Sequence, residues 1–224
     1  MNKKNKIKEL FIYQLISFAL FIRILIIIVS DYNQNVSFIG EDAWGMHLAG
    51  LDVSNWENIN FFDQTKIPYI SFLAIIYKYI YPSYLLSALI SLVAWILSIY
   101  ILMKILNLLR INKNIVIIIL LIYCFFPTSI IYTSSTIREP YQLLVTNLML
   151  LCVVSIYFTN NFLQIVLYFF MIIFLSFVFY LLHRIGPIFG IINLLISLLI
   201  LFSKFRFKKI YVLNGFLFLF ILIF

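Results

Sequence analysis

Two adjacent carboxylates, Glu41 and Asp42, are the residues of this chain whose types and spacing best suit chemistry. They belong to one polar stretch between two long apolar runs. Most of the eight acidic residues of the chain share that stretch: Asp31, Glu41, Asp42, Asp52, Glu57 and Asp63. A carboxylate at a water–lipid boundary can take a proton from an attacking hydroxyl group, or hold a divalent cation beside a phosphate. Glu41 and Asp42 are therefore the candidate catalytic residues, and the candidate ligands if a metal is used.

Two further polar segments supply candidate substrate-binding residues: Arg138 with Glu139, and His183 with Arg184. An arginine can donate a fork of hydrogen bonds to a phosphate. The alternatives are structural. Arg138 and Glu139 can cap a helix and pair with each other, and Arg184 can extend to the membrane interface. His47 is the only imidazole near the acidic pair, and we interpret it as an ordinary loop residue.

The composition indicates an integral membrane protein. The chain is 65% hydrophobic and 11% charged, and its mean hydropathy is +1.11. Apolar runs of about twenty residues match the length of a helix that crosses a bilayer. Residues 115–122 and 165–179 are apolar on every face, which excludes the alternating pattern of a transmembrane barrel. We therefore predict an all-α, polytopic bundle of transmembrane helices.

The pattern predicts about seven spans in one transmembrane domain covering residues 1–224. Residues 1–9 form a basic tail, 10–30 the first span, 31–83 a loop with an interfacial helix, and 84–224 the rest. The later spans are 84–109, 114–132, 140–158, 162–182, 186–203 and one beginning near Tyr211. Pro127 is expected to end or kink the third span, and nearby hydroxyl groups to satisfy the backbone groups that it frees.

The basic residues predict the orientation. Most of them fall on one side if the N-terminus is cytoplasmic: Lys3, Lys4, Lys6, Lys8, Lys104, Arg110, Lys113, Lys204, Arg206, Lys208 and Lys209. The acidic loop and the turns at 133–140 and 183–187 are then external. The net charge of +8 is accordingly an anchor at a lipid surface, and we expect no nucleic acid partner.

Three segments within this topology need separate interpretations. Residues 67–83 are rich in tyrosine and too short to span comfortably, so an interfacial helix is favoured over a tilted extra span. Residues 40–50 contain few turn residues after Gly40, and they can form a helix that lies on the membrane. Arg23 is costly inside the first span unless it faces other helices, which suggests a structural or substrate role.

This arrangement resembles the GT-C membrane glycosyltransferases, and in particular the branch of protein O-mannosyltransferases and aminoarabinose transferases. The resemblance is carried by the order of spans and by three motifs. These are Glu41-Asp42 in the first external loop, the Phe126-Pro-Thr-Ser turn with Arg138-Glu139, and Arg184. Family members are usually about twice as long, so the resemblance implies a truncated member or a minimal module that needs a partner.

The resemblance implies a function. GT-C enzymes transfer a sugar from a polyprenyl-phosphate donor to a lipid, glycan or protein acceptor on the non-cytoplasmic side. An acidic residue of the first external loop serves as base or helps to bind a divalent cation, and here Asp42 or Glu41 would take that role. Arg138 and Arg184 would contact the donor phosphate. The expected location is the bacterial inner (plasma) membrane.

A non-catalytic membrane subunit or a transporter-like protein is the alternative. No acidic residue lies deep in a predicted span, which weakens the case for a transporter. Cys124 and Cys152 lack metal-site spacing and are expected to be buried thiols. A subunit that packs against a larger membrane complex remains open on sequence grounds.

Overall fold

The described part of the chain is entirely helical. The computed structural model describes residues 3–32, 41–55, 68–183 and 186–205, and no strand occurs within these ranges. Their helices are α1 (Lys3–Tyr32), α2 (Glu41–Ser54), α3 (Pro68–Tyr79), α4 (Tyr84–Leu108), α5 (Lys113–Phe125), α6 (Pro127–Thr133), α7 (Glu139–Phe158), α8 (Phe162–Leu182) and α9 (Gly186–Phe205). The prediction of an all-α fold is confirmed.

Five helices are long and apolar enough to cross a membrane: α1, α4, α7, α8 and α9. A sixth candidate is the pair formed by α5 and α6, which is bent by 58°. Such a set of helices characterises a multi-pass integral membrane protein. The seventh predicted span, which begins near Tyr211, lies outside the described residues.

The predicted third span is divided into two helices at Pro127. Phe126 is extended, with φ −61° and ψ 125°, and Pro127 begins α6. Proline has no backbone N–H and fits the first turn of a helix, so it ends α5 and starts α6 at one point. The kink predicted at Pro127 is thus present.

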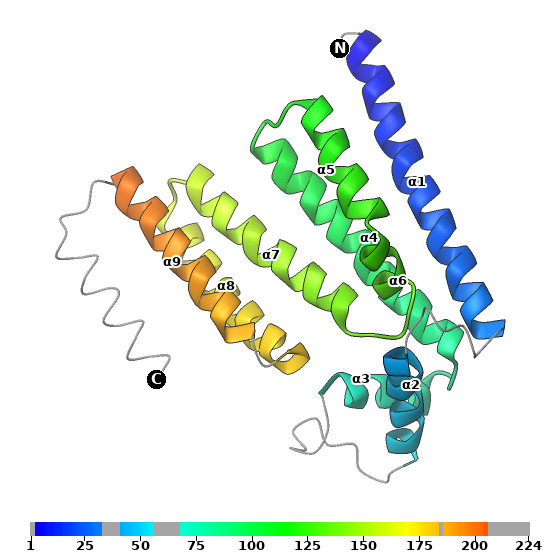
Figure 1. The fold of residues 1–224 in the computed structure, drawn as a ribbon. Coiled ribbons are helices and arrows are strands. Elements are labelled where there is room, and N and C mark those ends of the chain that lie inside the picture. Colours follow the sequence, from blue (N-terminus) through cyan, green and yellow to red (C-terminus); the bar gives the residue numbers. More distant parts are fainter. Residues whose placement is uncertain (1–2, 33–40, 56–67, 184–185, 206–224) are drawn as a thin grey trace. The chain divides into compact units, whose positions relative to one another are not determined.

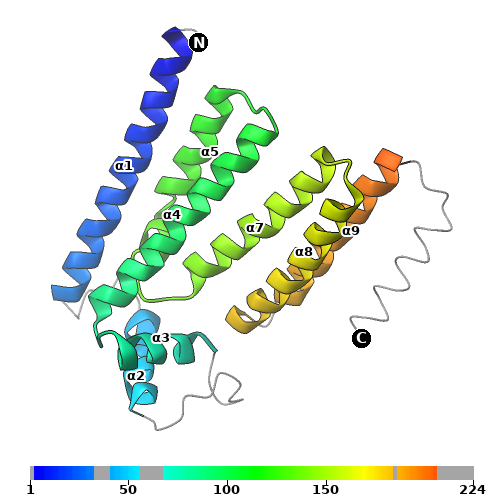
Figure 2. The same cartoon turned by 180° about the vertical axis from the view of Figure 1, so that it is seen from behind.

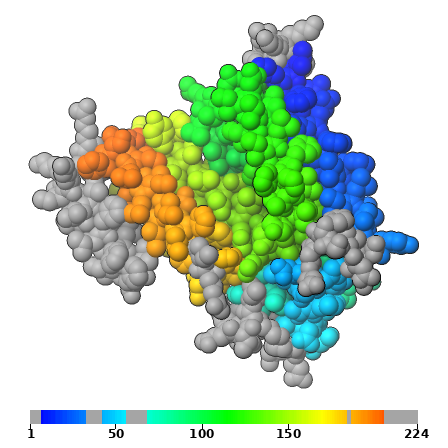
Figure 3. All heavy atoms as spheres, in the orientation of Figure 1, coloured from blue at the N-terminus to red at the C-terminus, as the bar shows by residue number. Residues whose placement is uncertain are grey.

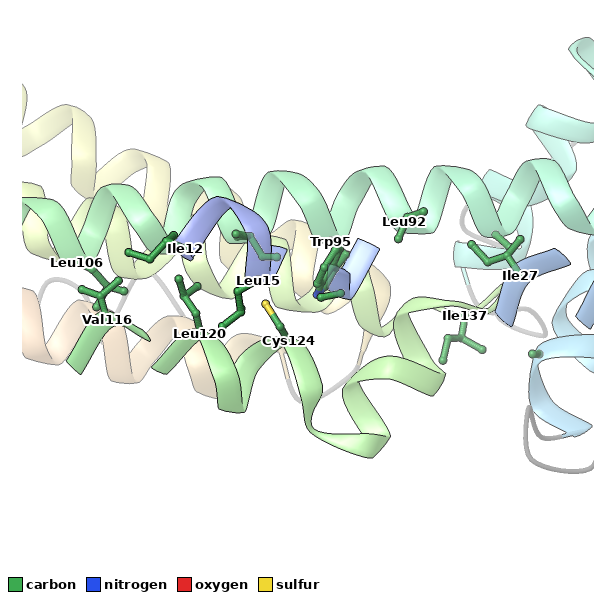
Figure 4. Close-up of a cluster of buried hydrophobic side chains, with 14 of the residues drawn as sticks. Ile12, Leu15, Ile27, Leu92, Trp95, Leu106, Val116, Leu120, Cys124 and Ile137 are labelled. Carbon is green, nitrogen blue, oxygen red and sulfur yellow. The ribbon is translucent and has the colours of Figure 1, made fainter. Parts of the chain in front are cut away.

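The described residues form two compact units, one up to Leu144 and one from Val145. In the first unit, α1 packs against α4, α5 and α6 around a buried apolar cluster. Trp95 of α4 and Leu120 and Cys124 of α5 lie at its centre, and none of the three is exposed (Figure 4). This division does not test the prediction that residues 1–224 form one transmembrane domain, which stays a prediction.

The second unit comprises the later part of α7 with α8 and α9. Its core includes Met149, Ile156 and Ile172, which have no exposed surface. The amine of Lys204 donates to the carbonyl oxygens of Tyr157 at 2.8 Å and Thr159 at 2.5 Å. The last described turn of α9 is thereby joined to the connection between α7 and α8.

Helices α2 and α3 lie beyond the ends of α1 and α4 and do not run between them (Figures 1 and 2). They pack chiefly against each other. With 12 residues, α3 is shorter than the roughly 20 residues that a membrane span needs. The segment predicted as an interfacial helix is therefore a short separate helix, and the helix predicted over residues 40–50 is present as α2. We call this region the α2/α3 end of the first unit.

Candidate functional site

Helix α2 carries the candidate catalytic pair in its first turn. Glu41 is its first residue, and the side chain of Asp42 is exposed. Ala43, His47 and Gly50 recur at helical spacing and are buried, so they form the inner face of α2. In the space-filling view, α2 lies at the surface of this end of the unit (Figure 3). The first turn of α2 thus exposes a carboxylate while another face of the helix is buried. The positive end of the helix dipole lies at this turn and favours negative charge there.

A chain of buried hydrogen bonds anchors that face. Nδ1 of His47 and the hydroxyl of Tyr77 share a hydrogen bond of 2.7 Å. The Tyr77 hydroxyl donates to Oγ of Ser87 at 3.1 Å, and Oγ of Ser87 lies 2.7 Å from Oγ1 of Thr136. The chain joins α2, α3 and α4 to the segment between α6 and α7. These hydrogen bonds therefore hold four elements together at the α2/α3 end.

Aromatic rings surround His47. The ring of Trp44 stacks on that of Tyr84, with centroids 4.6 Å apart and planes 10° from parallel. The imidazole meets the rings of Trp44, Tyr77 and Tyr84 edge-on. Burial lowers the pKa of His47, although the negative charge of Asp31 acts in the opposite direction. Burial also raises the pKa of Tyr77 to about 12. Both groups are consequently neutral at physiological pH.

His47 is a correction to the sequence interpretation. We interpreted it as an ordinary loop residue, but it lies within α2 and only 6% of it is exposed. The partner that buries it, Tyr77, is thirty residues away along the chain. No local pattern around residue 47 signals that contact.

The polar segment between α6 and α7 is buried and largely satisfied by its own helix. Residues 133–136 are at most 2% exposed. Oγ of Ser134 donates to the carbonyl of Ile130 at 2.7 Å, and Oγ of Ser135 donates to that of Ile131 at 3.1 Å. Closer to the break, Oγ of Ser129 donates at 3.0 Å to the carbonyl of Tyr123, which is the group that Pro127 leaves without an N–H partner. A hydroxyl group thus satisfies the freed backbone group, as the sequence predicted.

Glu139 is the first residue of α7 at this same end, and Arg138 directly precedes it. The backbone carbonyl of Arg138 accepts hydrogen bonds from the N–H groups of Tyr141 and Gln142, each at 3.1 Å. Nε of Arg138 lies 3.9 Å from Oε1 of Glu139, and both side chains are partly exposed. This geometry agrees with the predicted helix start and mutual pairing. The role of both residues in binding substrate stays a prediction.

Arg23 was a weak candidate for a structural or substrate role on sequence grounds. In the structure it lies in the interior of the first unit. Its guanidinium lies 3.7 Å from the centroid of the Trp95 ring and is fully buried. Nε donates to Oγ1 of Thr133 at 2.7 Å, and Nη1 donates to the carbonyl of Ala19 at 3.1 Å. Nη2 lies 3.4 Å from Oγ of Ser129. Arg23 thus faces other helices, as its position in a span requires.

The second pair of predicted substrate residues belongs to the other unit. The backbone N–H of His183 donates to the carbonyl of Phe179 at 2.7 Å, which ends α8. Arg184 lies outside the described residues. The substrate roles of His183 and Arg184 therefore stay predictions.

No group of three or more His, Cys, Asp or Glu side chains in the described ranges is arranged to hold a metal ion. The side chain of Glu41 lies outside the described part, so a cation held by Glu41 and Asp42 stays a prediction. The expected burial of Cys124 and Cys152 is confirmed. Comparisons with protein families, with curated proteins and with solved structures found no match.

Proposed function

We propose that this protein is a GT-C type glycosyltransferase that moves a sugar from a polyprenyl-phosphate donor to an acceptor at the membrane surface. One observation carries the proposal: Asp42 is exposed in the first turn of α2, and α2 is anchored at the same end of the unit where Arg138 directly precedes α7. A base and a phosphate-binding cation are the two groups that this transfer needs most.

The charge distribution supports an external position for the α2/α3 end. The opposite end of the first unit is basic. There Lys113 pairs with Glu9, and the amine of Lys8 donates to Oδ1 of Asn114 at 2.6 Å. Lysine and arginine gather on the cytoplasmic side of membrane proteins. The proposal therefore has a cytoplasmic N-terminus, external α2 and α3, and a location in the bacterial plasma membrane.

The proposed reaction is a single displacement. Asp42, or its neighbour Glu41, takes the proton from an acceptor hydroxyl group, whose oxygen then attacks the anomeric carbon of the donor sugar. The bond between that carbon and the phosphate oxygen breaks, and polyprenyl phosphate leaves with the bonding electrons. Arg138 neutralises charge that develops on the phosphate. In this proposal Glu139 makes a further contact with the donor, and a divalent cation, if used, is held by Asp42 and Glu41.

The test replaces the carboxylates without changing their size. Asp42→Asn and Glu41→Gln membranes are assayed for sugar transfer from polyprenyl phosphomannose and polyprenyl phospho-aminoarabinose. Loss of a general base lowers rates by roughly 10²–10⁴-fold, so at least one variant is expected to lose at least about 100-fold. Asp52→Asn is the matched control, because Asp52 is another exposed acid of α2.

Unchanged transfer in both variants would refute catalysis by this pair. If the wild-type membranes transfer no sugar and the variants instead fail to assemble into a larger complex, the chain is a non-catalytic membrane subunit.

A further inference from the structure

A cavity lies in the second unit, where α7 and α9 both end. It has a volume of about 620 Å³ and is partly open to the surface. Tyr157, Phe158 and Asn160 line it from the end of α7 and the link to α8, and α9 lines it from Ile196 to Lys204. All of these residues belong to the second unit. Sites that hold small molecules have volumes of roughly 300–1,000 Å³, so this cavity is large enough to admit a ligand.

The part of α9 that lines the cavity is one helix face that changes from apolar to polar. Its members, at intervals of three or four residues, are Ile196, Leu199, Ile200 and Ser203, and Lys204 follows at the polar end. Leu199 is 61% exposed, so the described helices do not cover its side chain. At a rise of about 1.5 Å per residue, Lys204 lies about 12 Å along the helix from Ile196. The cavity therefore has an apolar part within the candidate span and a polar part at its end.

The polar part of the cavity carries a positive charge whose position is fixed. The amine of Lys204 donates to the carbonyl oxygens of Tyr157 and Thr159. Both acceptors are neutral, so these hydrogen bonds hold the ammonium without cancelling its charge. Residues 145–224 contain lysine and arginine but no aspartate or glutamate. An anion in the cavity therefore meets positive charge and no side-chain carboxylate from this part of the chain.

The aromatic residues at the end of α7 suit the level of lipid headgroups. Tyr157 and Phe158 are its last two residues, and they are 56% and 47% exposed. Tyrosine is enriched at the boundary between membrane and water, because its ring is apolar and its hydroxyl is polar. Lys204 is the last residue of the candidate span in α9. In the proposed orientation this end is cytoplasmic, where anionic lipids attract lysine and arginine.

We propose that this cavity binds an anionic glycerophospholipid. Its phosphate meets Lys204 and Asn160, and one of its acyl chains follows Ile196 and Leu199. A soluble anion would leave the apolar part of the cavity empty, and an uncharged lipid would gain nothing from the positive charge. A lipid with a negative headgroup matches both parts at once. The proposal does not depend on sugar transfer, and the bound lipid joins the link between α7 and α8 to α9.

The test titrates the full chain, purified in detergent, with phospholipids and measures bound lipid by native mass spectrometry. Phosphatidylglycerol supplies an anionic headgroup, and phosphatidylcholine with the same acyl chains is the zwitterionic comparison. We expect phosphatidylglycerol to bind roughly fivefold more tightly, which is the factor that one nearby lysine contributes at a lipid surface. Lys204→Gln is expected to remove this preference, and Lys204→Arg to keep it. Lys104→Gln is the matched control, because Lys104 is an exposed lysine of α4.

A second variant tests the apolar part of the cavity and leaves the hydrogen bonds of Lys204 in place, so it decides the matter if Lys204→Gln does not fold. Leu199→Trp is expected to weaken binding of both lipids several-fold, because the acyl chain loses its apolar contact there. Leu167→Trp, at a 58% exposed position of α8, is expected to bind as the wild type does.

Equal affinity of the wild type for the two lipids, or an unchanged affinity for phosphatidylglycerol in either Lys204→Gln or Leu199→Trp, overturns the proposal. Displacement of the lipid by an equal concentration of inorganic phosphate also overturns it, because the ligand is then a soluble anion.

Discussion

At the residue scale, Arg23 shows how one cation is accommodated inside an apolar bundle without a carboxylate partner among the described residues. The face of Trp95, the hydroxyls of Thr133 and Ser129, and the carbonyl of Ala19 surround the guanidinium. These groups come from α1, α4 and α6, so one side chain joins three elements. Arginine suits this role because its planar fork donates in several directions while its face stacks on an aromatic ring.

Arg23→Ala is therefore expected to destabilise the first unit by about 2–4 kcal/mol. The substitution removes the cation–π contact and leaves the hydroxyl of Thr133 and the face of Trp95 beside a cavity. Unfolding by denaturant in detergent micelles measures the change. Lys104→Ala, at an exposed position of α4, is expected to change stability by less than about 0.5 kcal/mol. Equal effects of the two substitutions would show that Arg23 does not bind these helices together.

His47 is expected to make the α2/α3 end sensitive to acid. Burial lowers the pKa of His47 in the folded chain below the value of about 6.5 for an unfolded histidine, with Asp31 opposing the shift. Between those two values the unfolded chain binds a proton that the folded chain does not, so stability falls as the pH falls. The contribution is complete above a pH of about 6.5 and decreases below it.

Amide hydrogen exchange of α2 at a series of pH values measures this loss. Protection of the α2 amides, taken relative to the intrinsic exchange rate at each pH, is expected to fall below a pH of about 6.5 in the wild type and to stay flatter in His47→Gln. An identical pH profile in the two proteins would assign the acid response to another group.

At the element scale, the packing of α2 on α3 depends on the absence of a side chain at Gly50. A Cβ there would lie 3.0 Å from Cε2 of Tyr77 and 3.1 Å from Cβ of Leu73. Gly45, on the other face of the same helix, has nothing within 4 Å of such an atom. The two glycines therefore allow close packing to be separated from helix propensity.

Gly50→Ala is expected to destabilise the α2/α3 end by about 1–3 kcal/mol, because the added methyl group forces the helices apart. Gly45→Ala is expected to stabilise α2 by up to about 1 kcal/mol, since alanine is the better helix former and meets no neighbour. Limited proteolysis near α2 measures both effects. A stabilising Gly50→Ala would contradict the close packing of α2 on α3.

At the scale of the whole molecule, the proposed orientation counts the bent pair α5 and α6 as one span, which gives six crossings up to α9. The N-terminus and the connections at Asn112 and Asn160 are then on one side of the membrane, and Asn55 is on the other. Single cysteines at these exposed asparagines, in a variant without Cys124 and Cys152, are expected to react with impermeant reagents accordingly. Labelling of residues 55 and 112 from the same side would overturn the proposed orientation.

Much of the helical framework was predictable from composition and span length, because a bilayer-spanning helix must satisfy its own backbone and show an apolar surface. The break at Pro127 was predictable for a local reason, since proline cannot continue the hydrogen-bond ladder. The carboxylate pair was also visible as a cluster of charge in an apolar chain. The hydrogen bonds that anchor α2 could not be predicted from the sequence. His47 bonds to Tyr77 and Ser87 to Thr136, and both pairs are far apart along the chain.

The sequence by itself determined that this is a helical membrane protein, where most of its long helices begin and end, and which acidic residues stand apart; α1 begins at Lys3, within the segment predicted as a tail. These properties follow from local chemistry: apolar length, proline and charge. Only the tertiary structure decided that His47 is buried, that Arg23 joins three helices, and that the rings of Tyr69 and Tyr141 meet. The physical reason is that the residue type alone does not show whether a hydroxyl or imidazole is buried. Its burial and its hydrogen-bond partners depend on which distant helices pack beside it.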